Sequence, residues 1–135
     1  MPLLRGVFNK CSRTVALLAM VIPAAQTLAG DVAAGKAVYQ KNCQACHQPT
    51  GAGIKGAFPP LTDNPNIKDN PAHIANSILK GQSGHITVNG DSYNGMMPPL
   101  AHLSDENIAD VVAFILVEWN NSKTTLSADD IKALR

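Results

Sequence analysis

The chain has 135 residues, of which 45% are hydrophobic and 16% charged, with 11 Lys and Arg against 10 Asp and Glu. This length suggests one domain with a modest core, and the ordinary composition excludes an intrinsically disordered chain. The nearly neutral balance also excludes the basic footprint of a nucleic-acid-binding domain, so we expect no nucleic-acid partner.

The N-terminal segment has the layout of a secretory signal peptide. Basic residues come first, an uncharged apolar run follows over residues 15–22, and Thr27 and Ala29 have cleavage-site spacing. The apolar run falls short of the ~20 residues that span a bilayer. We therefore predict a signal peptide over residues 1–29, with an uncleaved anchor as the alternative. A periplasmic domain without a membrane span would then occupy residues 30–135.

The next pattern is a helix that leads into a pair of cysteines. Residues 31–42 have helical spacing with Asp31 as a plausible N-cap, and Cys43, Cys46 and His47 follow as CxxCH. On a helical turn, residues i, i+3 and i+4 lie on neighbouring positions of one side. Both thiols could then form thioethers to haem vinyl groups, with His47 under the iron. CxxCH is the signature of c-type haem attachment, so we predict one covalent haem c.

Other uses of paired thiols fit this sequence less well. A structural zinc site needs four ligands, and no second CxxC is present. A thioredoxin-like centre would follow a strand rather than a helix. A disulfide between Cys43 and Cys46 would close too small a loop to stabilise much, and it would leave His47 unexplained. The third cysteine, Cys11, lies in the predicted signal.

Residues 93–100, YNGMMPPL, contain the strongest candidates for a second axial ligand. A thioether opposite histidine stabilises ferrous haem iron and raises its reduction potential. Most methionines only fill gaps in a core. Here a flanking proline would hold the sulfur in place. We favour Met97, which directly precedes Pro98, over Met96, and His102 is the histidine alternative.

Between these two motifs the sequence is rich in Gly and Pro and is expected to consist largely of loops. It also contains a helix that begins near Pro71 and ends at Gly81, with His73 on its surface. An Asn-Gly pair at residues 89–90 predicts a short β-hairpin over residues 85–93.

The C-terminal part is expected to supply a long core helix and a short terminal one. Ser104 can cap a helix whose first turn is acidic. The apolar residues of this helix repeat at helical spacing and are expected in the core: Ile108, Val111, Val112, Ile115 and Trp119. Ser127 and Asp130 have the spacing of a capping box, which predicts the terminal helix.

Together these residues resemble class I c-type cytochromes, the small monohaem electron carriers. The resemblance covers residues 30–135 through GKAVYQKNCQACH, GAGIKGAFPPL, NPAHIANSILKG, VNGDSYNGMMPPL and LSDENIADVVAFILVEWNN. It implies an all-α cytochrome c fold, with helices packed around one covalently attached haem and a small β-hairpin near residues 85–93. Within the class, the chain is most similar to cytochrome subunits or domains of periplasmic dehydrogenases and copper nitrite reductases.

The resemblance also implies roles for individual residues. Cys43 and Cys46 match the thioether cysteines, His47 the proximal ligand and Met97 the distal ligand. Pro59 matches the proline whose backbone carbonyl accepts a hydrogen bond from the proximal imidazole, a contact that fixes its tautomer and raises its basicity.

Two further positions bear on the resemblance. Gly35 matches the small residue at the crossing of the first and last helices of the family. Met96 departs from the usual pattern, in which a small aliphatic residue precedes the distal methionine.

We therefore expect an electron carrier and not an enzyme. His/Met ligation leaves no open position for a substrate, and the protein supplies ligands, a dry pocket and a docking face. It would act free or as the redox subunit of a larger oxidoreductase, with redox protein partners such as a dehydrogenase, a reductase or a terminal oxidase. The alternative is a five-coordinate haem enzyme or gas-binding protein with peroxidase-like activity, which needs an open distal site.

Overall fold

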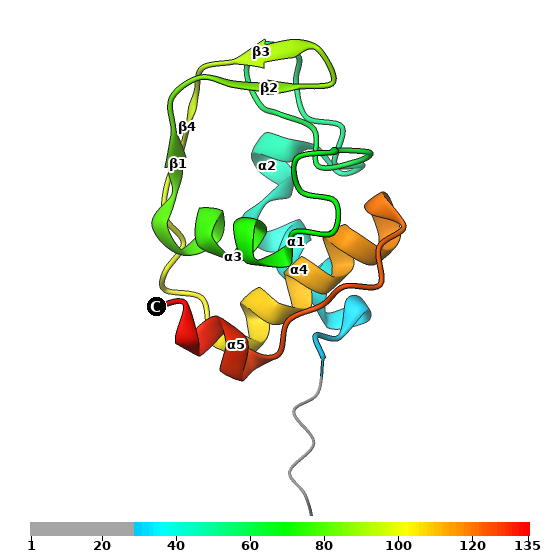
Figure 1. The fold of residues 1–135 in the computed structure, drawn as a ribbon, viewed down its shortest axis with the longest axis vertical. Coiled ribbons are helices and arrows are strands. Elements are labelled where there is room, and N and C mark those ends of the chain that lie inside the picture. The colour runs from blue at the N-terminus through cyan, green and yellow to red at the C-terminus, as the bar shows by residue number, and fades with distance from the viewer. Residues whose placement is uncertain (1–28) are drawn as a thin grey trace, which may run out of the picture.

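The computed structural model describes residues 29–135, so the predicted signal lies outside the described residues except for Ala29. The helices are α1 (Val32–Asn42), α2 (Gln44–His47), α3 (Pro71–Lys80), α4 (Asp105–Asn120) and α5 (Ala128–Ala133). The strands are β1 (Gln82–Ser83), β2 (Ile86–Val88), β3 (Asp91–Tyr93) and β4 (Met96–Met97). Figure 1 shows the hairpin of β2 and β3 at one end of the molecule and α5 at the other.

The first helix begins where the sequence predicted. Asp31 is its N-cap, and its carboxylate accepts hydrogen bonds from the backbone N–H groups of Ala33 and Ala34. The backbone N–H of Asp31 donates in turn to the carboxylate of Asp110 on α4, at 2.7 Å. The cap of α1 therefore also joins α1 to α4, and the buried Gly35 lies at this crossing.

The core is built around α4. Ser104 caps this helix through a hydrogen bond from the N–H of Asn107, as predicted. The predicted core residues Ile108, Val111, Val112 and Ile115 are all buried. Trp119 is partly buried and packs edge-on against Tyr39 of α1, with ring centroids 4.8 Å apart. These apolar contacts hold the first and last long helices together.

The predicted hairpin is present. β2 and β3 pair antiparallel, with Ile86 opposite Tyr93. Asn89 and Gly90 form the turn, with φ of 51° and 85°. Two consecutive residues with positive φ are typical of the type I′ turns that join two-residue hairpins.

The terminal helix α5 is confirmed with its capping box. Ser127 accepts a hydrogen bond from the N–H of Asp130, and the carboxylate of Asp130 accepts one from the N–H of Ser127. Ile131 on α5 is fully buried against the core. Across residues 29–135, no helix combines the length and apolarity needed to cross a bilayer.

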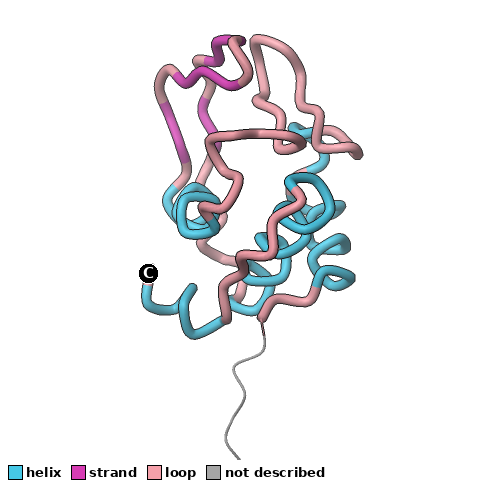
Figure 2. The backbone as a smooth tube through the Cα atoms, turned by 45° about the vertical axis from the view of Figure 1, so that its right-hand side comes forward, coloured by secondary structure: helices cyan, strands magenta, loops and turns pink. Residues whose placement is uncertain are grey.

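Loops occupy the region between the second and third helices. Residues 48–70 contain no regular helix or strand, apart from an isolated bridge between Ile54 and Phe58. Figure 2 shows the extent of these loops, drawn in pink. The fold is therefore mostly helical with short antiparallel strand pairs, and the loops supply much of the site described next.

Candidate haem site

A cavity of about 530 Å³ lies among α2, α3, α4 and the strands. Cys43, Cys46, His47 and Met97 all line it. Its other walls are mainly apolar and include Phe58, Ile67, Ile74, Ile78, Val88 and Ile115. The volume lies within the range of roughly 300–1,000 Å³ of pockets for small molecules and cofactors. The fold thus brings the two sequence motifs, which are far apart in the chain, to one apolar cavity.

The CxxCH segment forms the single helical turn that the spacing predicted. The N–H groups of Cys46 and His47 both donate to the carbonyl of Cys43, at 3.2 and 3.0 Å. Cys43 and Cys46 form no disulfide with each other; Cys43 is partly buried and Cys46 is exposed. Burial, together with the neighbouring Cys46, raises the pKa of Cys43 to about 11. A raised thiol pKa disfavours the thiolate form on which a thiol redox centre depends.

His47 is buried, and its Nδ1 lies 3.0 Å from the carbonyl oxygen of Pro59. A carbonyl can only accept, so Nδ1 carries the proton and Nε2 keeps its lone pair. Burial lowers the pKa of His47, and the hydrogen bond to Pro59 opposes this effect more weakly. The neutral imidazole, which is the form that binds metals, is therefore favoured.

The two neighbouring methionines differ in their surroundings. β4 pairs antiparallel with β1, which places Met97 opposite Gln82 and Met96 opposite Ser83. Successive side chains on a strand point to opposite faces. Met97 is partly buried and packs against the core, whereas Met96 is 78% exposed. Both border the cavity, but only Met97 is held against the core by its surroundings.

The pairing of β1 with β4 was not predicted from the sequence. Each strand has only two residues, which is too short for a recognisable alternation of polar and apolar side chains. The pairing matters because it fixes the segment that carries Met97 to the end of α3.

The other histidines are exposed. His102, the histidine alternative to Met97, is not among the described residues that line the cavity. His73 is exposed on α3, as predicted, but it also borders the cavity, which was not predicted from the sequence. A signal for this was present, because His73, Ile74, Ser77 and Ile78 share one helical face and all four line the cavity.

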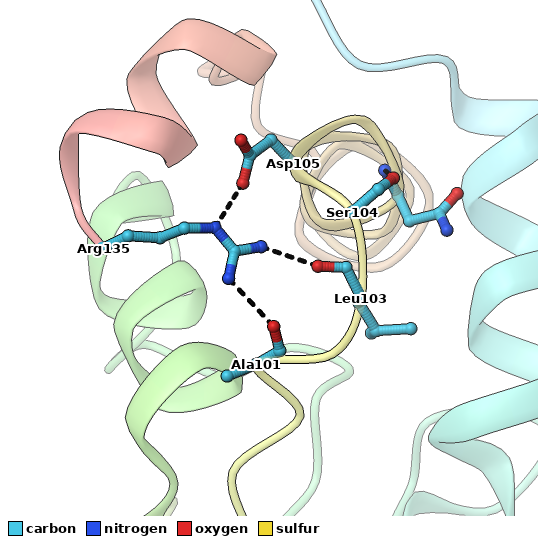
Figure 3. A network of polar contacts seen from close by, with 6 residues as sticks. Ala101, Leu103, Ser104, Asp105 and Arg135 are labelled. Atoms are coloured by element: carbon cyan, nitrogen blue, oxygen red, sulfur yellow. Dashed lines mark hydrogen bonds and ion pairs between the residues drawn. The ribbon is translucent and has the colours of Figure 1, made fainter.

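Arg135 secures the segment that follows Met97 (Figure 3). Its Nη1 donates to the carbonyl of Ala101 at 2.9 Å, and its Nη2 donates to the carbonyl of Leu103 at 2.6 Å. Its Nε donates to the carboxylate of Asp105 at the start of α4, at 2.5 Å. Nothing in the sequence pointed to this arginine, because all three partners lie about 30 residues away.

A buried imidazole, two cysteines on one helical turn and a methionine around an apolar cavity define the site of a c-type haem protein. The family model for cytochrome c matches residues 32–119. The chain belongs to the cytochrome c family. The resemblance to class I c-type cytochromes and the expected fold are thereby confirmed.

Individual relatives are similar over most of the chain. The chain is 42% identical over 108 residues to the cytochrome c subunit of the quinone alcohol dehydrogenase of Gluconobacter oxydans, an alignment that covers 78% of this chain and 23% of that protein. It is 36% identical over 110 residues to cytochrome c-552 of Thermus thermophilus, with 75% of this chain and 83% of that protein covered. It is 33% identical over 109 residues to the fructose dehydrogenase cytochrome subunit of Gluconobacter japonicus, with 75% and 22% covered.

The chain thus spans about a quarter of the dehydrogenase subunits but most of cytochrome c-552. Membership of the family gives the prosthetic group, a covalently bound haem c. It also gives the general role of the chain, which is to carry electrons.

Proposed function

We propose that this chain is a periplasmic electron carrier in which His47 and Met97 are the axial ligands of one haem c and Cys43 and Cys46 are its thioether attachments. Residues 1–29 would be a signal peptide and residues 30–135 the cytochrome c domain. The observation that carries the proposal is that the buried imidazole and the core-packed thioether border the same apolar cavity.

The proximal side is supported by the contact of His47 with Pro59. The hydrogen bond orients the imidazole and leaves Nε2 as its only nitrogen able to bind a metal. The adjacent thiols on the same turn would fix the haem covalently, so that its position does not depend on the strength of axial ligation.

The distal side is supported by the way Met97 is held. The paired strand β4, the two prolines that follow and the contacts of Arg135 all limit movement of this segment. When bound, the haem supplies an iron that changes between ferric and ferrous states. Ligands held in this way would move little between the two states, which favours rapid electron transfer over substrate chemistry.

The surroundings of the cavity support exchange of electrons with other proteins. Its apolar walls would exclude water from the site, while Cys46, Ala57 and Met96 at its border are exposed. A cofactor edge close to such a border would be within reach of a partner in a weak, transient complex. The chain would serve either as a free carrier or, by analogy with relatives that are cytochrome subunits of dehydrogenases, as the redox unit of a dehydrogenase.

The experiment that tests the ligands is an optical spectrum of the haem-loaded protein, ferric and ferrous, with Met97→Ala and Met96→Ala as a matched pair. We expect a low-spin wild type with a sulfur–iron charge-transfer band. Met97→Ala should abolish the band, and Met96→Ala should keep it. Loss of the band in Met96→Ala alone would instead make Met96 the ligand.

The same measurement tests the alternative function. A high-spin wild type that readily binds cyanide or carbon monoxide would have an open distal site and would favour a five-coordinate enzyme or gas-binding protein.

The location is tested separately, by cell fractionation and by the mass of the exported protein. A chain that begins at Gly30 in the periplasm is expected, and a full-length chain in the membrane fraction would favour the uncleaved anchor.

A further inference from the structure

Three successive backbone carbonyls beside the proximal histidine are each bound by a side chain. They belong to Pro59, Pro60 and Leu61. Their respective partners are His47 Nδ1 at 3.0 Å, Asn64 Nδ2 at 2.8 Å and Asn120 Nδ2 at 2.8 Å. The carbonyl that contacts the proximal imidazole is therefore the first of a fixed series.

The two asparagines are buried, with exposures of only 4% for Asn64 and 3% for Asn120. The Oδ1 of Asn120 accepts from the backbone N–H of Asn64 at 3.0 Å, and its Nδ2 also donates to the carbonyl of Ile115. The Oδ1 of Asn64 accepts from the N–H of Asn66 at 2.9 Å. Burying a side-chain amide costs free energy unless its oxygen and nitrogen both form hydrogen bonds. In Asn64 and Asn120, Oδ1 and Nδ2 are both hydrogen-bonded.

The segment needs such contacts because it is short of backbone donors. Pro59 and Pro60 have no N–H group, so this part of the chain cannot be held by a β-ladder. Their rings fix φ, and the peptide planes are rigid, which leaves few soft dihedral angles between one carbonyl and the next. Anchoring the second and third carbonyls therefore restricts the direction of the first, which faces His47.

We propose that Asn64 and Asn120 are positioning residues for the proximal histidine: by holding the carbonyls of Pro60 and Leu61, they keep the Pro59 carbonyl on His47 Nδ1 and so help to set the reduction potential. This inference rests on the proposed ligation by His47. A strong hydrogen bond to Nδ1 makes the imidazole a better electron donor, which favours ferric iron. Weakening that bond should raise the reduction potential.

The test is the reduction potential of haem-loaded Asn64→Leu and Asn120→Leu. Leucine has a similar volume and cannot form the hydrogen bonds. We expect a higher potential in both variants, with a roughly two- to tenfold larger ferrous-to-ferric ratio at a fixed applied potential; tenfold corresponds to about 59 mV for one electron.

Two controls separate positioning from general damage. Asn76→Leu removes a similar bond, from Asn76 Nδ2 to the carbonyl of Ala72 at 2.9 Å, at a position outside the cavity lining. Ile131→Ala weakens the core at α5, away from the site. Both controls should keep the wild-type potential. An equal rise in either control would overturn the inference.

A second readout follows the hydrogen bond itself. In the ferrous protein, the His47 Nδ1 proton should exchange slowly with solvent in the wild type and faster in both asparagine variants. If the variants do not accumulate with haem, the wild type alone still tests the hydrogen bonds on which the inference rests. A scalar coupling between the Asn120 side-chain nitrogen and the Leu61 carbonyl carbon is expected, and its absence from a well-resolved spectrum would overturn the proposed network.

The outcomes distinguish this inference from the proposed function. Unchanged potentials and proton exchange in Asn64→Leu and Asn120→Leu, with wild-type spectra, would overturn the positioning role and leave His47/Met97 ligation intact. A wild type without the low-spin, sulfur-ligated spectrum would overturn the proposed ligation itself.

Discussion

Gly35 lies directly against the backbone of Asp110. A Cβ atom at position 35 would lie 2.0 Å from the carbonyl oxygen of Asp110 and 2.8 Å from the Cβ of Phe114. Rotation of a side chain cannot relieve the first contact, because the oxygen belongs to the backbone of α4. The crossing of α1 and α4 therefore depends on the absence of a side chain at this position. Since α1 ends next to Cys43, the crossing also sets where the CxxCH turn lies.

Replacing Gly35 should therefore destabilise the protein. Leucine favours the helix more than glycine does, but the overpacking at α4 is expected to dominate and to cost on the order of 1–3 kcal/mol. Thermal unfolding of haem-loaded Gly35→Leu should give a clearly lower melting midpoint than that of the wild type. Ala37→Leu, an exposed position on the same helix, is the control and should change the midpoint little. An unchanged midpoint in Gly35→Leu would contradict the role of the crossing.

Gly81 should control the segment that carries Met97. Its φ is +73°, and a Cβ would lie 2.6 Å from the carbonyl oxygen of Met97. Alanine at this position would push on the paired strand, so Gly81→Ala should weaken the sulfur–iron band and make the haem bind cyanide faster. Ferric optical spectra and cyanide-binding kinetics measure both effects.

The matched control for Gly81 is Gly90→Ala. Gly90 has a similar φ of +85°, but its Cβ would have no neighbour within 4 Å. Both variants suffer the strain of a positive φ, about 1–3 kcal/mol. The strain is larger at Gly81, whose ψ of 177° completes a conformation that essentially only glycine adopts, and only Gly81→Ala also places a Cβ against the Met97 carbonyl. Equal spectra and equal cyanide-binding rates in the two variants would contradict the predicted effect of position 81 on the Met97 segment.

Arg135 should stabilise the fold through the three hydrogen bonds of its planar guanidinium group rather than through its charge alone. Lysine keeps the charge but cannot reach the two carbonyls and the carboxylate together. The contacts are partly exposed, so we expect Arg135→Lys to lose about 1–2 kcal/mol in urea unfolding. Arg135→Ala should lose a similar amount, and the exposed Lys132→Ala should lose little. Wild-type stability in Arg135→Lys would show that charge alone suffices.

The capping box of α5 should contribute to acid sensitivity. Hydrogen bonds from the Ser127 hydroxyl and backbone hold the pKa of Asp130 below its ordinary value. The unfolded chain therefore takes up this proton first. The stabilisation is fully present above the ordinary pKa of ~4 and is lost as the pH falls through the lower value of the folded state.

The variant Asp130→Asn tests this dependence. It should unfold at a lower urea concentration than the wild type at pH 7, and the difference should shrink below pH 4. Asp129→Asn, which alters the neighbouring exposed carboxylate without disturbing the capping box, is the control. A difference between Asp130→Asn and the wild type that stays constant with pH would contradict the shift in pKa.

Local sequence was sufficient wherever an interaction spans only a few residues. The caps at Asp31 and Ser104, the Asn-Gly turn of the hairpin and the CxxCH turn were all predicted correctly. In each of them the partners are within about four positions, so backbone geometry alone brings them together. The sequence by itself also determined the family, because these motifs occur in a fixed order along the chain.

The tertiary structure alone decided what surrounds the two proposed ligands. It packs Met97 against the core and leaves Met96 exposed, and it brings His73 to the edge of the cavity. It also brings Asn120 to the carbonyl of Leu61 and Arg135 to the carbonyl of Ala101. These partners are separated by long stretches of chain, and nothing in their local sequence favours one partner over another. They meet only because apolar burial of α1, α3 and α4 fixes where the loops between them must run.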